Sequence, residues 1–323
     1  MITPKIPLLK DGQILSVDVV NSIIKRTEYA GDLLKQYKLI AGNEMYVEPH
    51  YDGTRVSYLQ PVGGGGTPQP VTSPYRIAGT YGLGGRNRIF IYDGSTYTDI
   101  YFGDNKQILG LGWKIGISGS NIVGSYSVNG NVISFLYNGL IETEIRVPNS
   151  ERTDAFDIDG LNIVGAYLLS STFRGFLYNG STYTDLSFPS SIRTLPYGID
   201  GSNIVGAYFL TSTFRGFFYN GSTYTDIFVP GSSDTRAYGV SGSSIVGSYV
   251  LNGVVRGFLY NGSTFVDIFV PGSSGTIPYG IDGSNIVGFY ALNGVNRGFL
   301  YNGSTYTDIF VPGSTSTIAF GIG

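Results

Sequence analysis

The sequence predicts a mainly β protein: a six-bladed β-propeller closed by its C-terminal strand and preceded by a small helix-plus-hairpin anchor domain. Three observations predict this fold: a repeat of fixed length, turn signals inside each copy, and a match between the two ends of the repeat region. We expect the anchor at residues 1–60, a Gly/Pro linker at 61–74 and the propeller at 75–323.

The repeat is the strongest signal in the sequence. A segment reading Asn-Ile-Val-Gly, or a near copy, recurs every 41 residues. Its last residues are Gly124, Gly165, Gly206, Gly247 and Gly288, and Gly79 ends a diverged sixth copy. An Asn-Gly pair keeps the same step at Asn138, Asn179, Asn220, Asn261 and Asn302. Repeats of 40 to 45 residues are typical of stacked or circular arrays such as propellers.

Each copy divides into four short strands. In the copy at 237–278, the expected strands are 237–240, 244–250, 255–260 and 263–270, with turn residues at each boundary. Asn-Gly favours a two-residue hairpin turn, because both central residues of a type I′ turn have positive φ. Four antiparallel strands in about 41 residues match the size of one propeller blade.

The two ends of the repeat region complement each other. The first copy begins at Tyr75 with its second strand, whereas residues 317–323 match 276–282, the first strand of a copy. We therefore expect the last strand to complete the first blade, which gives six blades.

Residues 1–60 carry different signals. Ser16 is a plausible N-cap for a helix from Val17 to about Ile40 that stops at Gly42. Its apolar stripe consists of Val19, Ile23, Ala30, Leu33, Tyr37 and Ile40. This face could pack on a hairpin in which 45–47 turns at Asp52-Gly53 into 56–59, or on another chain, and both can hold. Four glycines and several prolines at 61–74 indicate a linker.

Composition excludes several classes of function. The net charge is -3 and 13% of residues are charged, which argues against a nucleic-acid partner. Cysteine is absent, and His50 is the single histidine, so we expect no metal site, no cofactor and no histidine-based catalysis in the repeats. The first residues do not read as a signal peptide, and no apolar run is long enough to span a membrane.

One acidic residue recurs at the same place in each copy: Asp99, Glu144, Asp185, Asp226, Asp267 and Asp308. Such a ring could bind a metal or act in acid–base chemistry. The turn arithmetic favours structural pairs instead, because an arginine opposes the acid in five copies. The expected pairs are Arg88–Asp99, Arg174–Asp185, Arg215–Asp226, Arg256–Asp267 and Arg297–Asp308, while Ile133 stands opposite Glu144.

Residues 198–221 carry a family resemblance. They read Gly-Ile-Asp-Gly-Ser-Asn-Ile-Val-Gly-Ala-Tyr and then Arg-Gly-Phe-Phe-Tyr-Asn-Gly. This pattern resembles the HAF-type extracellular repeat of bacterial proteins, with Arg-Gly in place of His-Ala and Tyr in place of Trp. The resemblance extends over 75–323 and implies a β-propeller of surface proteins, without implying any chemistry.

The copies differ from one another mainly on one face, which holds the turns between second and third strands and the connections between blades. Divergence there indicates differentiated binding, although drift of loops predicts the same pattern. The candidate binding residues are Lys106, Trp113, Asn129, Asn131, Phe173, Phe214, Asn252 and Asn293.

The layout of anchor, linker and rigid ring resembles bacteriophage fibres and other receptor-binding virion proteins. We expect a non-enzymatic structural protein of a tail or capsid appendage, oligomeric in its assembly and extracellular after lysis. Its partners would be other virion proteins and a host-surface glycan, without nucleic acid or membrane insertion. The alternatives are a bacterial surface or scaffold propeller that makes protein contacts, and a polysaccharide-degrading enzyme.

Overall fold

The computed structural model describes residues 39–41, 45–47, 75–103, 105–109 and 114–323. The chain divides into two compact units, residues 1–71 and 72–323. In the first unit, β1 (Leu39–Ala41) pairs antiparallel with β2 (Met45–Val47), and Ile40 lies opposite Tyr46.

This ladder corrects the end of the expected helix. Ile40 belongs to a strand, because its backbone pairs with β2 rather than with the preceding turn of a helix. Met45–Val47 pairs with 39–41, while the expected partner at 56–59 lies outside the described residues. Val19, Ile23, Ala30, Leu33 and Tyr37, the rest of the expected helix and the linker lie outside the described residues.

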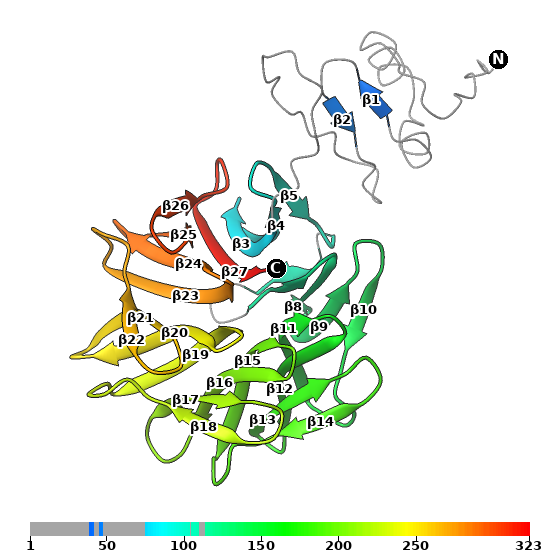
Figure 1. Ribbon diagram of the computed structural model, residues 1–323. Coiled ribbons are helices and arrows are strands. Elements are labelled where there is room, and N and C mark those ends of the chain that lie inside the picture. Colours follow the sequence, from blue (N-terminus) through cyan, green and yellow to red (C-terminus); the bar gives the residue numbers. More distant parts are fainter. Residues whose placement is uncertain (1–38, 42–44, 48–74, 104, 110–113) are drawn as a thin grey trace, which may run out of the picture. The chain divides into compact units, whose positions relative to one another are not determined.

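The second unit is a ring of six antiparallel sheets (Figure 1). Blade one consists of β27 (Ser316–Ile322), β3 (Ile77–Leu83), β4 (Arg86–Tyr92) and β5 (Tyr97–Ile100). Blade two consists of β6 (Gln107–Ile108), β7 (Gly116–Ser118), β8 (Asn121–Val128), β9 (Asn131–Tyr137) and β10 (Glu142–Ile145). Blade three consists of β11 (Arg152–Asp159), β12 (Asn162–Leu169), β13 (Thr172–Tyr178) and β14 (Tyr183–Leu186).

The last three blades repeat the same order from the inner strand outward. Blade four consists of β15 (Arg193–Asp200), β16 (Asn203–Phe209), β17 (Phe214–Tyr219) and β18 (Tyr224–Ile227). Blade five consists of β19 (Asp234–Ser241), β20 (Ser244–Leu251), β21 (Val254–Tyr260) and β22 (Phe265–Ile268). Blade six consists of β23 (Gly275–Asp282), β24 (Asn285–Leu292), β25 (Val295–Tyr301) and β26 (Tyr306–Ile309).

The two ends of this unit share one sheet, as the sequence predicts. β27 pairs antiparallel with β3, and Ala319 lies opposite Gly79. The amide of Arg76 donates to the carbonyl of Gly323 at 2.8 Å. The prediction of six blades closed by the C-terminal strand is therefore confirmed.

The repeated glycine and a phenylalanine form the centre of each blade. The phenylalanine comes from the third strand and is at most 1% exposed: Phe90, Phe135, Phe176, Phe217, Phe258 and Phe299. A Cβ at Gly206 would lie 2.1 Å from the carbonyl of Leu195 and 2.7 Å from the ring of Phe217. The second strand therefore carries glycine because the inner strand and the ring leave no room for a side chain.

The Asn-Gly pairs form two kinds of turn. Asn252 (φ 51°) and Gly253 (φ 79°) make the expected two-residue turn, with Leu251 opposite Val254. The Asn-Gly pair between third and fourth strands instead opens a four-residue loop, with Tyr260 opposite Phe265.

The side chain of Asn261 explains this difference in register. Its Oδ1 accepts the amides of Ser263 at 3.0 Å and Thr264 at 2.9 Å, so the side chain caps the loop. The expected direct opposition of arginine and acid is therefore wrong: Phe217, not Arg215, lies opposite Asp226.

We predict that Gly206→Ala lowers the free energy of unfolding by about 3 kcal/mol, because the added methyl meets backbone and a buried ring. Gly275→Ala is the matched control, since the nearest atom to its Cβ is 3.8 Å away. Urea unfolding of both variants measures the difference. Equal stability of the two would contradict this account of the repeated glycine.

Candidate functional site

The inner strands surround the axis of the ring and line it with aromatic side chains. Each belongs to the residue at which the inner strand bulges: Phe156, Tyr197, Tyr238, Tyr279 and Phe320. Neighbouring ring centroids lie 5.3, 5.3, 5.0 and 4.9 Å apart in that order. These aromatic rings form a collar around the axis and narrow the space between the inner strands.

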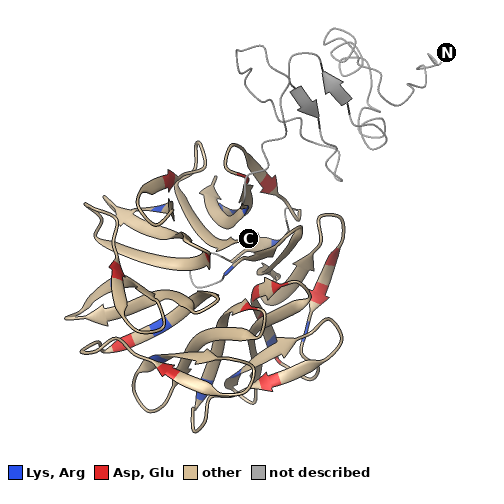
Figure 2. Ribbon diagram, viewed as in Figure 1, with Lys and Arg blue, Asp and Glu red and all other residues tan. Residues whose placement is uncertain are grey.

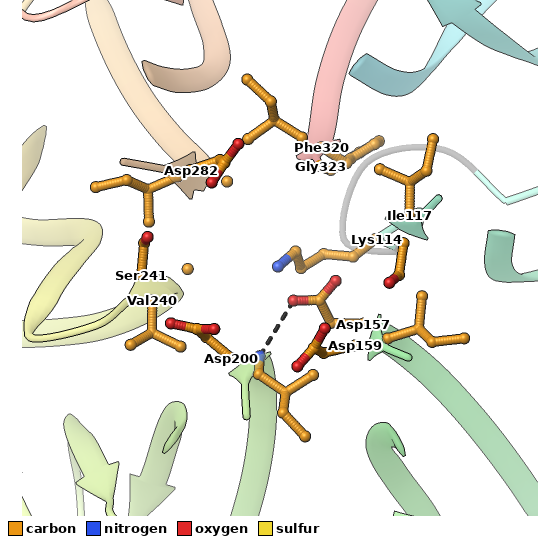
Figure 3. A pocket seen from close by; sticks show the side chains of 18 of the residues that line it. Lys114, Ile117, Asp157, Asp159, Asp200, Val240, Ser241, Asp282, Phe320 and Gly323 are labelled. Atoms are coloured by element: carbon orange, nitrogen blue, oxygen red, sulfur yellow. Dashed lines mark hydrogen bonds between the residues drawn. The ribbon is translucent and has the colours of Figure 1, made fainter. Parts of the chain in front are cut away.

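A cavity of about 240 Å³ lies at the end of the inner strands (Figure 3). Its mouth is formed by the last residues of five inner strands, Ser118, Asp159, Asp200, Ser241 and Asp282, and by Gly323, which follows β27. Some of these side chains tie one blade to the next. The amide of Gly201 donates to Asp159 Oδ2 at 2.8 Å, and the amide of Gly160 donates to Ser118 Oγ at 3.0 Å. Aspartate and serine thus perform the same structural role at this position.

Two charged residues in the cavity break the repeat. Where Lys114 stands, the other copies have Ala155, Pro196, Ala237, Pro278 and Ala319. Where Asp157 stands, the other copies have Gly116, Gly198, Gly239, Gly280 and Gly321. Lys114 is 5% exposed, and its Nζ donates to the carbonyls of Tyr197 and Tyr238, both at 2.8 Å. Asp157 Oδ2 accepts the amide of Ile199 at 3.2 Å.

The inner strand of blade two is longer than those of the other blades, and the extra residues place Lys114 in the cavity. Residues 109–115 separate the paired Ile108 and Gly116, whereas only 154–156 separate the equivalent Thr153 and Asp157. The four extra residues, seven minus three, split the strand into β6 and β7. Figure 3 shows the Lys114 side chain pointing to the centre of the cavity, with Asp157 beside it.

Burial shifts the pKa of each group in the direction that favours its uncharged form. Burial lowers the pKa of Lys114, and the charge of Asp157 opposes that shift. Burial raises the pKa of Asp157, while the Lys114 ammonium and the amides of Ile199 and Ile158 oppose it. Each charge therefore stabilises the other, because water has little access to this buried site and solvates the charges poorly. Backbone carbonyls thus hold Lys114 at the axis, with Asp157 near it.

Sequence reasoning missed both residues. The available signal was a charged residue at an inner-strand position where every other copy carries glycine, alanine or proline. The structure describes no group of three or more His, Asp or Glu that could hold a metal ion in 75–103, 105–109 or 114–323.

The recurring acids of the outer strands lie in a second kind of site. Figure 2 shows acidic residues on these strands around the ring. In blade four the hydroxyl of Tyr208 donates to Asp226 Oδ1 at 2.8 Å, and Arg215 Nε donates to the same atom at 3.2 Å. Ion pairs also join Arg88–Asp99, Arg256–Asp267 and Arg297–Asp308. Asp185 accepts from Tyr167 at 2.8 Å, but no ion pair of the described residues joins it to Arg174.

Blade two builds this site from other residues. Glu144 pairs with Arg146 at 3.7 Å on the surface. The hydroxyl of Tyr126 donates to Glu142, whose other oxygen accepts from Lys106 Nζ at 2.6 Å. Sequence reasoning placed the acid of this site at Glu144. The irregular inner strand of blade two made it impossible to predict that Lys106 would lie beside Glu142.

The expected binding residues that the structure describes lie in several blades, on the face opposite the cavity mouth. Asn129, Asn252 and Asn293 are the first residues of two-residue turns, each with φ 51°. Phe173 lies 5.6 Å from the Arg152 guanidinium, Phe214 lies 4.3 Å from that of Arg236, and Lys106 lies 4.5 Å from the Tyr126 ring. Asn131 is exposed at the start of β9, and Trp113 lies outside the described residues.

The outer site of a blade consists of its recurring acid and the arginine of its third strand, and in blade five this pair is more exposed than in blades one, four and six. Arg215 and Arg297 stack on Phe228 and Phe310, 4.1 and 4.2 Å from the ring centroids. Phe269 is the counterpart in blade five and is 47% exposed, without such a stacking contact among the described residues. Arg256 and Asp267 share one hydrogen bond of 3.3 Å and are 46% and 53% exposed.

We predict that Lys114→Met lowers the free energy of unfolding by about 2 to 4 kcal/mol, because it removes the donor to two buried carbonyls and the positive charge that stabilises Asp157. Adding Asp157→Gly, the residue of the other copies, should recover part of that loss. Urea unfolding of the single and double variants measures both effects. A double variant as unstable as the single one would show that the two charges are not coupled.

No family model matches the chain, and no curated protein is significantly similar to it in sequence. The resemblance to the HAF-type repeat therefore stays a prediction. No helix of the described residues is long and apolar enough to cross a membrane.

Solved structures are similar in fold. TolB from Acinetobacter baumannii aligns with a TM-score of 0.58 and 15% identity over 77% of this chain, which spans 66% of the TolB chain, just under two thirds. The β-propeller domain of the Trilobed protease from Pyrococcus furiosus, described as having an open velcro topology, aligns with a TM-score of 0.50 and 9% identity, over 73% of this chain and 78% of that domain. At these identities the likeness shows the fold alone: the described part of the chain after residue 74 is a six-bladed β-propeller, closed by its own last strand.

Proposed function

We propose that this chain is a non-enzymatic binding propeller that attaches to a cell-surface glycan through the outer site of blade five. The observation that carries the proposal is the joint exposure of a guanidinium, a carboxylate and an aromatic ring at Arg256, Asp267 and Phe269. Sugar hydroxyls donate to carboxylates and accept from guanidinium groups, and the apolar face of a sugar ring packs on an aromatic ring.

The contacts of the outer-strand acids support binding over hydrolysis at this site. A glycosidase needs two carboxyl groups about 5 to 9.5 Å apart across the scissile bond, with one of them able to donate a proton. The recurring acids of the outer strands instead accept from tyrosine hydroxyls and pair with arginines. The one histidine of the sequence, His50, lies outside the described residues.

A glycan array of bacterial envelope polysaccharides tests the proposal. We expect the full chain to bind at least one polysaccharide without releasing reducing ends. Phe269→Ser introduces serine, the residue that blade three has at the equivalent position, Ser187, and should weaken binding about tenfold. Arg256→Ala should weaken binding to the same extent. Arg215→Ala is the matched control in a site where the guanidinium already covers the ring.

Two results would count against this assignment. One is binding that the Arg215 variant weakens as much as the Arg256 variant does. The other is the appearance of reducing ends, which would favour the polysaccharide-degrading alternative.

Attachment to a virion is a separate part of the proposal, supported only by the order of anchor, linker and ring in the sequence. In this hypothesis residues 1–60 join the chain to a tail or capsid, and other virion proteins are the partners. A neighbouring gene for capsid or tail parts would support it over the bacterial scaffold alternative.

We predict that deleting residues 1–62 leaves a folded monomeric ring that no longer joins the particle. Sedimentation and thermal unfolding report on the ring, and particle purification reports on incorporation. A truncated chain that still incorporates would refute the anchor assignment.

A further inference from the structure

Three apolar side chains stand out on the face that holds the cavity mouth. Leu140, Leu161 and Ile141 are 85%, 69% and 64% exposed, the three highest values among the large apolar side chains of the described residues. The other copies carry serine or threonine at these positions: Ser95, Ser181, Ser222, Ser263 and Ser304 for Leu140, the threonine that follows each of these for Ile141, and Ser120, Ser202, Ser243 and Ser284 for Leu161.

The turn of blade two does not require these side chains. Asn138 Oδ1 accepts the amides of Leu140 and Ile141 at 3.0 and 2.8 Å, as in the other copies. In blade three the hydroxyls of Ser181 and Thr182 donate to Asn179 Oδ1 as well, at 2.9 and 3.2 Å. Leucine and isoleucine therefore forgo two hydrogen bonds and expose apolar surface, which gives the fold no advantage.

The turns that carry these residues adjoin one another. A Cβ at Gly139 would lie 3.9 Å from Ser120 in the neighbouring turn of blade two. From that turn, Asn121 Nδ2 donates to the carbonyl of Gly160 in blade three at 3.5 Å. Gly160 directly precedes Leu161, so Leu140, Ile141 and Leu161 belong to one stretch of surface, here called the apolar turn patch.

The acidic mouth of the cavity borders this patch. Asp159 lines the cavity two residues before Leu161, and Asp200 and Asp282 line it further around the ring. Asp159 and Asp200 accept the amides of Gly201 and Gly242, and none of the three carboxylates belongs to an ion pair of the described residues. The mouth therefore has an excess of negative charge beside an exposed apolar surface.

We propose that the apolar turn patch and the acidic mouth together dock an extended segment of a partner protein that carries apolar side chains and at least one lysine or arginine. Charge complementarity selects this occupant, because a basic side chain can enter the mouth while its neighbours cover the leucines. A second copy of this chain fits less well, since a two-fold contact through this face would set one acidic mouth against the other.

The probe is a library of displayed random 12-residue peptides, sorted on the full chain. We expect the enriched peptides to combine apolar residues with lysine or arginine and to bind more weakly as salt rises. Leu140→Ser with Ile141→Thr and Leu161→Ser should weaken their binding about tenfold. Asp159→Ser with Asp200→Ser should do the same, because serine already holds this position in two blades.

Controls separate docking from folding. Ile192→Ser removes an exposed apolar residue from the opposite face, where Ser233 and Ser274 stand in other copies, and should leave binding unchanged. The triple variant should unfold at or above the temperature of the parent chain, because it restores hydroxyls to the turns.

Several results would overturn the proposal. They are a library without enriched peptides, enriched peptides that lack basic residues, and equal binding to the parent and both variants. Sedimentation showing a dimer that the triple variant abolishes would identify a second copy as the occupant and would also overturn it.

Discussion

The pairing of β27 with β3 is the contact on which the rest of the ring depends. It removes the free edge that an open first blade would present, and it joins residues at opposite ends of the unit, such as Gly79 and Ala319. Each blade packs against two neighbours and is tied to the next through its inner strand, as when Gly242 donates to Asp200 at 2.6 Å. A blade cannot bury both of its faces alone, so closure supplies the last neighbour that each sheet needs.

Sequence reasoning succeeded where structure follows from local chemistry or from counting. The number of blades and the closing strand came from the repeat, and the turn at Asn252-Gly253 came from the positive φ of both residues. It failed where one signal serves two structures. Asn261-Gly262 also reads as a hairpin turn, but its asparagine accepts two loop amides and opens a four-residue loop. Ile40 is compatible both with the apolar stripe of a helix and with a strand. Its pairing with Tyr46 shows that it belongs to a strand.

The axial cavity was beyond sequence reasoning for a physical reason. The carbonyls that hold Lys114 belong to residues 83 and 124 positions further along the chain, and nothing in their identity marks them, because every residue has a carbonyl. A buried ammonium is tolerable only where such acceptors converge, and convergence is a property of the closed ring. The copy-to-copy comparison of exposed loops could not show this, since Asp157 lies on β11 and Lys114 lies in the segment between β6 and β7.

The departures from the repeat gather in blades two and three. They include Lys114 and Asp157 on the axis, the Lys106–Glu142 pair at the outer strands, and Leu140, Ile141 and Leu161 in the turns. Because six near-copies share one set of contacts, each copy serves as a control for the others. A departure that makes compensating contacts, such as Lys106, is explained by folding. A departure that gives up hydrogen bonds and exposes apolar surface is not explained by folding. By this reasoning Leu140 and Leu161 need another explanation, whereas the charged residues of the axis do not. An exposed apolar patch from which the fold gains nothing is typical of a surface that recognises another molecule, which is why we propose docking there.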